Sequence, residues 1–281
     1  MKKYVLYDNI IQKNRTISFV TATKELLSFF NKDISILANT AEDKGCDKLA
    51  LNLDNFHYNN AKILAMANLK ESNILCVEDS SFLSLSLTKM KLEHNLEFKN
   101  EINSKLKKEN LELNLDISIS PLVKYIKDEI GFDKIFKTVK YDFTKFRTAL
   151  YLGSFWCDLE QVTDLSLYEN LLKLTGVELI RYSMKENSCG YEILNIKSNL
   201  AYKMAGTIML DMFDNACDFV VVNDARSFII FDNYQKELER SVNREINLSV
   251  FNLPQIILLA CGITDKNRLG LDKHKIKTEI I

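Results

Sequence analysis

Two short motifs with chemically capable side chains occupy similar places in the two halves of this 281-residue chain. Glu78 and Ser81 lie in an E-x-x-S-F motif, and Asp224 and Ser227 lie in a D-x-x-S-F motif. Carboxylate and hydroxyl oxygens are hard ligands that suit a divalent cation or a polar ligand. The same pattern is also typical of a helix N-cap, where the carboxylate accepts hydrogen bonds from the first backbone N–H groups. We favour the N-cap interpretation.

A third motif, Ser188-Cys189-Gly190, carries a thiol. A nearby cation, such as Lys185 or Arg226, would lower the pKa of that thiol and make it reactive. In the alternative interpretation, Cys189 is an inert small residue in a turn with Gly190. We favour the inert interpretation.

The remaining candidates for catalysis or metal binding are weak. The three histidines, His57, His94 and His274, are too far apart in sequence to indicate a pair of metal ligands. The six cysteines form no C-x-x-C pair, and we expect them to be reduced. The sequence has no P-loop, G-x-G-x-x-G, H-E-x-x-H or G-x-S-x-G motif.

Short apolar runs alternate along the chain with longer amphipathic segments, which predicts βαβ units and a mainly parallel sheet. Ala61–Lys70 and Lys203–Phe213 have the apolar spacing of helices. The predicted strands are Tyr4–Tyr7, Ile34–Leu37, Asn73–Val77, Leu115–Ile119, Thr148–Leu152, Val177–Arg181, Phe219–Val222 and Leu248–Phe251.

The order of features in the first half recurs in the second. After each E/D-x-x-S-F motif come a charged helical stretch with E-I-N, a strand, a proline and an apolar helix that ends near glycine. The pattern predicts an internal duplication with its joint in Lys137–Phe146. We expect an α/β fold of two pseudo-repeated lobes, 1–140 and 147–281, each a small, mostly parallel sheet flanked by helices. Ligands gather at the carboxyl ends of parallel strands, where both motifs lie.

Composition excludes several classes of protein. The chain has 37 basic and 38 acidic residues, so it lacks the positive excess of a general nucleic-acid binder. No run approaches 18 apolar residues, the length that would predict a transmembrane helix. The N-terminus lacks the features of a signal peptide. We expect a cytoplasmic protein whose membrane association, if any, is peripheral, on the inner face and through a partner.

The second half resembles the B subunit of heterodisulfide reductase and its relatives with cysteine-rich CCG domains, including the CCG-type subunit of some succinate dehydrogenases and fumarate reductases. Leu150-Tyr151-Leu152-Gly153-Ser154 looks like the family's strand that ends in Gly-Cys. Ser188-Cys189-Gly190 looks like its Cys-Cys-Gly, and Asp224-Ala225-Arg226-Ser227 falls on its Cys-Pro-x-Cys. The spacings agree, with 33 residues between Ser154 and Ser188 and 34 between Cys189 and Asp224.

In the first half, the same resemblance places five further positions on family cysteines. Asn9 takes the opening cysteine, Gly45-Cys46 takes the pair, and Glu78 and Ser81 take the Cys-x-x-Cys. The family binds iron–sulfur clusters through these cysteines. Of the ten that the resemblance leads us to expect, only Cys46 and Cys189 are present. Serine and asparagine are poor iron ligands beside thiolate, so we expect no cofactor.

Three functions remain open. The first is a degenerate CCG-domain subunit that serves as scaffold or docking partner for an iron–sulfur or flavoprotein subunit of a redox complex. The second is an electron-transfer or disulfide-reducing subunit with a reduced or shared ligand set. The third is a repurposed ligand-binding protein. Whether the chain is an enzyme stays open, since the family consists of oxidoreductases but most of its catalytic cysteines are absent here.

Overall fold

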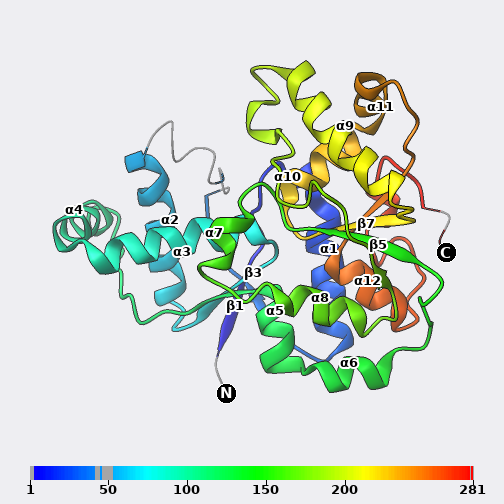
Figure 1. Ribbon diagram of the computed structural model, residues 1–281. Coiled ribbons are helices and arrows are strands. Elements are labelled where there is room, and N and C mark those ends of the chain that lie inside the picture. The colour runs from blue at the N-terminus through cyan, green and yellow to red at the C-terminus, as the bar shows by residue number, and fades with distance from the viewer. Residues whose placement is uncertain (1–2, 42–44, 46–52, 279, 281) are drawn as a thin grey trace. The chain divides into compact units, whose positions relative to one another are not determined.

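The computed structural model describes residues 3–41, 45, 53–278 and 280, and its eight described strands form two four-stranded parallel sheets (Figure 1). The first sheet has the order β2 (Ser35–Ile36), β1 (Tyr4–Tyr7), β3 (Asn73–Cys76) and β4 (Ile119–Pro121). The second has the order β6 (Glu178–Leu179), β5 (Arg147–Tyr151), β7 (Phe219–Val222) and β8 (Ser249–Asn252). The predicted α/β class is confirmed, and every described pairing is parallel.

The strand positions agree with the sequence periodicity except at β4. The predicted strand Leu115–Ile119 begins too early, because the backbone N–H of Asp116 donates to the side-chain oxygen of Asn114 at 2.9 Å. This local bond occupies the backbone in a turn and delays the strand. β4 therefore starts at Ile119, opposite Ile74 of β3.

The chain divides into two compact units, and each contains one sheet. The first unit is Met1–Ile11 with Asp33–Tyr125, and the second is Gln12–Lys32 with Ile126–Ile281. The helices of the first unit are α2 (Leu53–Asn68), α3 (Asp79–His94), α4 (Leu96–Lys107) and α5 (Leu122–Tyr125). The predicted helix Ala61–Lys70 lies largely within α2, which ends two residues earlier.

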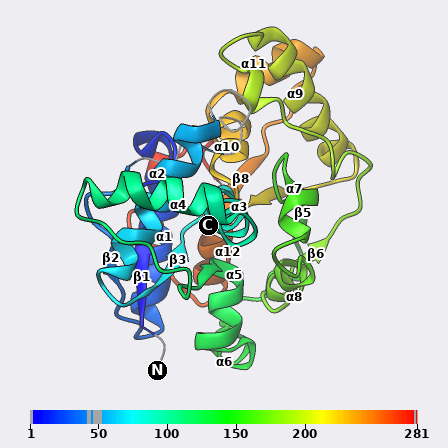
Figure 2. The same cartoon turned by 90° about the vertical axis from the view of Figure 1, so that its left-hand side faces the viewer.

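The second unit has a longer series of helices. They are α1 (Lys13–Phe29), α6 (Phe132–Thr138), α7 (Trp156–Glu160), α8 (Ser166–Lys173), α9 (Ser198–Asp214), α10 (Ala225–Phe228), α11 (Gln235–Val242) and α12 (Leu253–Ala260), with π-helical turns η2 (Ile126–Ile130) and η4 (Ile229–Asn233) and 3₁₀ turns η3 (Tyr191–Ile193) and η5 (Leu271–Lys273). Figure 2 shows α7, α8, β5 and β6 in this unit. Within the described part of the chain, no helix is both long and apolar enough to span a membrane.

Helix α1 follows a strand of the first sheet but belongs to the second unit. Its Phe19 ring packs edge-on against Phe228 of α10, with centroids 5.3 Å apart. Gly270 lies so close to α1 that an added Cβ would stand 2.8 Å from the Cα atom of Ser18. Because its apolar face is buried here, α1 is part of the core that supports α10. The repeat boundaries 1–140 and 147–281 concern sequence duplication and stay a prediction.

Candidate functional site

Three segments of the second unit meet beyond the carboxyl ends of β5 and β7. Cys189 lies at the centre, with its Sγ atom 3.4 Å from Ser154 Oγ and 3.9 Å from Ser227 Oγ. The backbone N–H of Cys189 donates to Ser154 Oγ at 3.2 Å, and the hydroxyl oxygens of Ser154 and Ser188 form a further hydrogen bond at 3.2 Å. We call Ser154, Ser188, Cys189 and Ser227 the hydroxyl–thiol network. The structure therefore brings together four of the five positions predicted in this half, and the fifth, Asp224, contacts the network through Ser227.

Asp224 is the N-cap of α10, as the favoured interpretation predicted. Its carboxylate accepts the backbone N–H of Ser227 at 2.8 Å and also the Ser227 hydroxyl. Gly153 lies against this carboxylate, since an added Cβ would stand 3.1 Å from both Cβ and Cγ of Asp224. Its φ of +93° is also one that side-chain-bearing residues rarely adopt. Glycine is thus needed here for both reasons.

The electrostatics of Cys189 contradict the reactive-thiol alternative. The residue is fully buried, and burial raises the pKa of its thiol to about 11, with the Asp224 carboxylate adding to the rise. The hydrogen bond with Ser154 offsets only part of that effect. Neither proposed cation activates the thiol: Lys185 pairs with Glu169 at 3.1 Å, and the guanidinium of Arg226 lies over the Phe155 ring at 5.4 Å. Cys189 is a protonated, buried side chain at neutral pH.

Two residues of the site were missed by sequence reasoning. The hydroxyl of Tyr151, at the end of β5, donates to the carbonyl of Asn187 at 2.7 Å and fixes the loop that carries Ser188. The Ser188 hydroxyl in turn donates to the Glu192 carboxylate. A repeated Leu-Tyr pair at the ends of β1 and β5 was the available signal for Tyr151, whereas nothing in the sequence marked Glu192.

In the first unit, Glu78 caps α3 in the same way. Its carboxylate accepts the backbone N–H of Ser80 at 3.0 Å and that of Ser81 at 2.7 Å, and it also accepts the Ser81 hydroxyl. Glu78 and Ser81 are both buried. The N-cap interpretation is confirmed in both halves, and the cap accounts for a carboxylate at each position.

Asn9 and Gly45 are the other first-half positions that the structure describes. The side-chain amide of Asn9 donates to the carbonyl of Thr40 at 2.8 Å, and Tyr7 donates to the Asn9 carbonyl at 3.2 Å. Gly45 has a φ of +79° and is buried. Cys46 lies outside the described residues.

The donors of the second-half site do not fit an iron–sulfur cluster. Such clusters are held mainly by several cysteine thiolates, and among the side chains that the structure describes this site offers one thiol, whose pKa is raised by burial. Its hydroxyls bond to one another, to the thiol and to carboxylates. Within the described residues, no three or more His, Cys, Asp or Glu side chains are grouped so that they could hold a metal ion.

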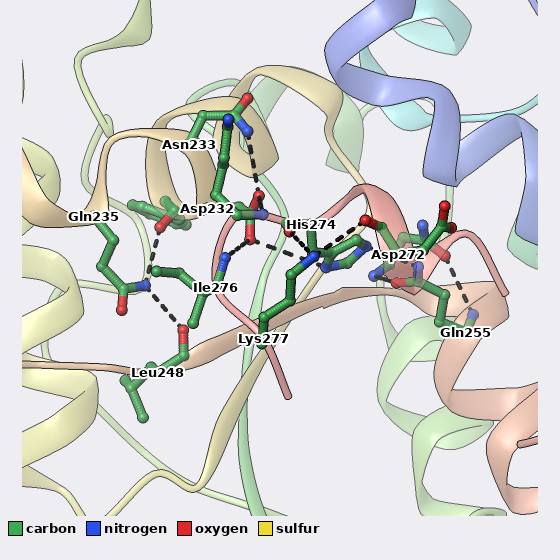
Figure 3. A network of polar contacts seen from close by, with 12 residues as sticks. Asp232, Asn233, Gln235, Leu248, Gln255, Asp272, His274, Ile276 and Lys277 are labelled. Carbon is green, nitrogen blue, oxygen red and sulfur yellow. Dashed lines mark hydrogen bonds and ion pairs between the residues drawn. The ribbon is translucent and has the colours of Figure 1, made fainter. Parts of the chain in front are cut away.

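A buried polar network holds the C-terminal segment around His274–Ile276 in place (Figure 3). Asp232 of η4 accepts the backbone N–H groups of Lys275 at 2.8 Å and Ile276 at 3.2 Å. His274 Nε2 accepts from the side-chain amide of Gln255 at 2.9 Å, because that amide nitrogen can only donate. The His274 ring also packs against Phe228 of α10 with centroids 4.9 Å apart.

The same network sets the charge of its titratable groups. Burial raises the pKa of Asp232 to about 6. Burial and the nearby Lys277 lower that of His274 to about 4. His274 is therefore a neutral structural residue at neutral pH. His57 and His94 also have ordinary partners, Thr88 Oγ1 at 3.0 Å and the Met90 carbonyl at 2.7 Å.

Comparison with known proteins agrees with this fold. The HdrB-like C-terminal domain family matches residues 191–275. The chain is 25% identical over 223 residues to the 8-methylmenaquinol:fumarate reductase membrane anchor subunit of Wolinella succinogenes, and the alignment covers 77% of each protein.

A crystal structure of a hypothetical protein from Helicobacter pylori superposes on the whole chain with a TM-score of 0.85 at 20% identity. This chain spans 53% of that solved chain, and the likeness concerns the fold alone. The family match and the relative lead to one conclusion: residues 191–275 match the HdrB-like C-terminal domain, and the chain is similar to the CCG-domain proteins of that family.

Proposed function

We propose that this protein is a docking or scaffold subunit of a redox complex, and that its second-half site has lost the iron–sulfur cluster of its family. The hydroxyl–thiol network supports the proposal most directly. Ser154 and Ser227 contact the one remaining thiol where the family would place further cysteines. Hydrogen bonds among these side chains satisfy the polar groups at the positions where cysteines of the family would ligate a cluster.

The partner in this proposal is an iron–sulfur or flavoprotein subunit. The Wolinella succinogenes relative is named as a subunit of a fumarate reductase, which supports assembly into a redox complex. The same relative is named as a membrane anchor, which supports peripheral membrane association through the complex. We place the chain in the cytoplasm or on the inner face of the membrane, without a nucleic-acid partner.

An internal duplication is part of the same proposal. The two sheets share one strand order, in which the second strand flanks the first and the third and fourth follow on its other side. The last paired residues of the central strands are Tyr7 with Cys76 in one sheet and Tyr151 with Val222 in the other. Counting two residues on from Cys76 and Val222 reaches the two caps, Glu78 and Asp224.

This register refines one first-half position. Three residues after Tyr151 is Ser154, and three residues after Tyr7 is Ile10, which is fully buried. Ile10 rather than Asn9 then corresponds to the opening cysteine. An isoleucine cannot ligate iron at all, which strengthens the proposal that the cluster has been lost from this half as well.

The proposal is tested by purifying the tagged chain without oxygen from its native source and identifying its stoichiometric partners. We expect a subunit with its own iron–sulfur or flavin group to co-purify at a fixed ratio. A complex that keeps its partner-borne cofactor when Cys189 is replaced by Ser supports a scaffold. A chain that purifies alone and is stabilised against heat by a small ligand would instead establish a repurposed binding protein.

The electron-transfer alternative predicts a different result in the same preparation. If the chain shares cluster ligands with a partner, Cys189→Ser should remove a spectroscopic iron–sulfur signal from the complex. Cys261→Ser serves as the matched control, because Cys261 is also a fully buried thiol but ends α12 away from the network. Loss of signal in the Cys189 variant alone would contradict the scaffold proposal.

A further inference from the structure

A cavity of about 260 Å³ opens beside the candidate site in the second unit. Its apolar lining comes from Leu150 of β5, Leu152 just after that strand, and Leu165 before α8. Leu150 and Leu152 are otherwise 4% and 7% exposed, so the floor is a continuation of the core. The volume is just below the roughly 300–1,000 Å³ of most drug-sized ligand sites, which favours a smaller occupant.

The rim of this cavity is acidic. Glu160, Glu169 and Glu186 line it together with one cation, Lys185. The ammonium of Lys185 is already paired with Glu169 at 3.1 Å. The rim thus carries two carboxylates in excess over its cation.

The chain segment that contributes Glu160, Leu165 and Glu169 is acidic overall. Residues 156–173 contain four acidic residues and one basic residue, Lys173, which pairs with Glu169 at 3.9 Å. One of them, Asp164, accepts the backbone N–H of Ser166 at 3.0 Å, and these bonds from Ser166 lower its pKa. An apolar floor under an acidic rim favours a side chain with an apolar stem and a cationic end.

We propose that this cavity receives an arginine side chain of a partner protein. Arginine fits better than lysine, because its planar guanidinium forms paired hydrogen bonds with a carboxylate and sheds water more readily. Its three methylene groups would cover Leu150, Leu152 and Leu165, while the guanidinium would bond Glu160 or Glu186. The inference deepens the proposed docking function, because the Lys185–Asn187 loop joins this cavity to Ser188 of the candidate site.

The test uses the whole chain and a small probe, N-acetyl-arginine methylamide. Methyl NMR spectra would follow Leu150, Leu152 and Leu165 during titration. We expect saturable shifts at these three leucines and none with the citrulline analogue, which has the same shape but no charge. The double variant Glu160→Gln/Glu186→Gln should weaken probe binding about five- to tenfold, as expected for the loss of two partly exposed charge pairs.

A matched control removes two carboxylates elsewhere in the same unit. Glu237→Gln/Glu245→Gln leaves the cavity lining intact and should leave probe binding unchanged. Equal binding of the citrulline analogue, or the same leucine shifts with Mg²⁺ alone, would overturn the proposal. Because the probe needs no partner, its failure would leave the redox-complex role standing, and failure to find a redox partner would leave the cavity result standing.

Discussion

The Sγ atom of Cys189 lies 3.4 Å from the hydroxyl oxygen of Ser154, although 35 positions separate the two residues in the chain. Ser154 lies three residues after the end of β5, and Cys189 lies in the loop whose Asn187 carbonyl accepts a hydrogen bond from the Tyr151 hydroxyl. A thiol with a hydroxyl neighbour is a hydrogen-bonded pair, whereas two thiols at this separation would be ready to share a metal. In the function proposed above, this pair stands where the family would place two cysteines.

Removing either N-cap carboxylate should lower the free energy of unfolding by a measurable amount. Asp224→Ala removes the acceptor for the Ser227 backbone N–H and hydroxyl, so it should lower the free energy of unfolding by about 1–3 kcal/mol. Asp224→Asn keeps a side-chain acceptor and should lower it less. Chemical denaturation measures both. Glu78→Ala should behave similarly, and variants as stable as the wild type would refute the capping role.

Gly153→Ala should be more damaging than Gly131→Ala. Both glycines have a φ near +90°, which costs an alanine about 1–3 kcal/mol in either place. An alanine Cβ at position 153 would also meet Asp224 at 3.1 Å, whereas nothing lies within 4 Å of a Cβ at position 131. We expect an additional loss of about 1 kcal/mol for Gly153→Ala in urea unfolding. If the two variants lost equal free energy of unfolding, the close approach of position 153 to Asp224 would make no contribution to stability.

Cys189 should resist alkylation in the folded protein. At pH 8 its thiol is protonated, because burial raises its pKa to about 11, and it is also inaccessible to reagent. Iodoacetamide treatment followed by peptide mapping should leave Cys189 unmodified in buffer and label it fully in denaturant. Rapid labelling in the native state would restore the reactive-thiol interpretation that the structure contradicts.

Asp232 and His274 should have opposite effects on acid stability. The folded-state pKa of Asp232, about 6, exceeds its ordinary 3.8, so this residue stabilises the fold as pH falls from 6 toward 4. The folded-state pKa of His274, about 4, is below its ordinary 6.5, so this residue destabilises the fold over a similar range. Each contribution amounts to about 3 kcal/mol, and the two nearly cancel.

The variant Asp232→Asn removes one of these opposing contributions. Its free energy of unfolding should fall more steeply than that of the wild type between pH 6.5 and 4.5, by about 2 kcal/mol over that interval. Denaturation curves at five or six pH values would measure the difference. Parallel pH profiles for the two proteins would contradict the account of this buried pair.

Restoring the family's ligands tests the mapping of the second half. The quadruple variant Ser154→Cys/Ser188→Cys/Asp224→Cys/Ser227→Cys places four more thiols around Cys189. Anaerobic reconstitution with iron and sulfide should then give a coloured protein. The same variant with Cys189→Ala is the control and should bind less iron. Identical, colourless products would count against these positions as ligand equivalents.

The sequence was most informative where structure depends on local pattern. Apolar runs placed seven of the eight described strands to within two residues, and the E/D-x-x-S spacing identified both caps, because a cap acts on N–H groups two or three residues away. β4 begins later than predicted, because the hydrogen bond to the Asn114 side chain holds the backbone before it in a turn. The eventual contact of Ser154 with Cys189 followed only from the family resemblance.

Other features depend on contacts between distant segments and had no local signal. The packing of α1 in the second unit rests on Phe19 meeting Phe228 and on Gly270 approaching Ser18. The raised pKa of Cys189 rests on complete burial, which a Ser-Cys-Gly turn in the sequence does not reveal. Lys185 was a candidate activator of the thiol in the less favoured interpretation, and its ion pair with Glu169 is a tertiary contact.

The most direct test of the central claim is the iron and acid-labile sulfide content of this chain after it is purified without oxygen and separated from its partners. We predict neither element above trace level on the chain itself, with any iron and sulfide remaining on a co-purified subunit. Iron and sulfide in whole-number ratios on the isolated chain would contradict the claim that its cluster has been replaced by the hydroxyl–thiol network.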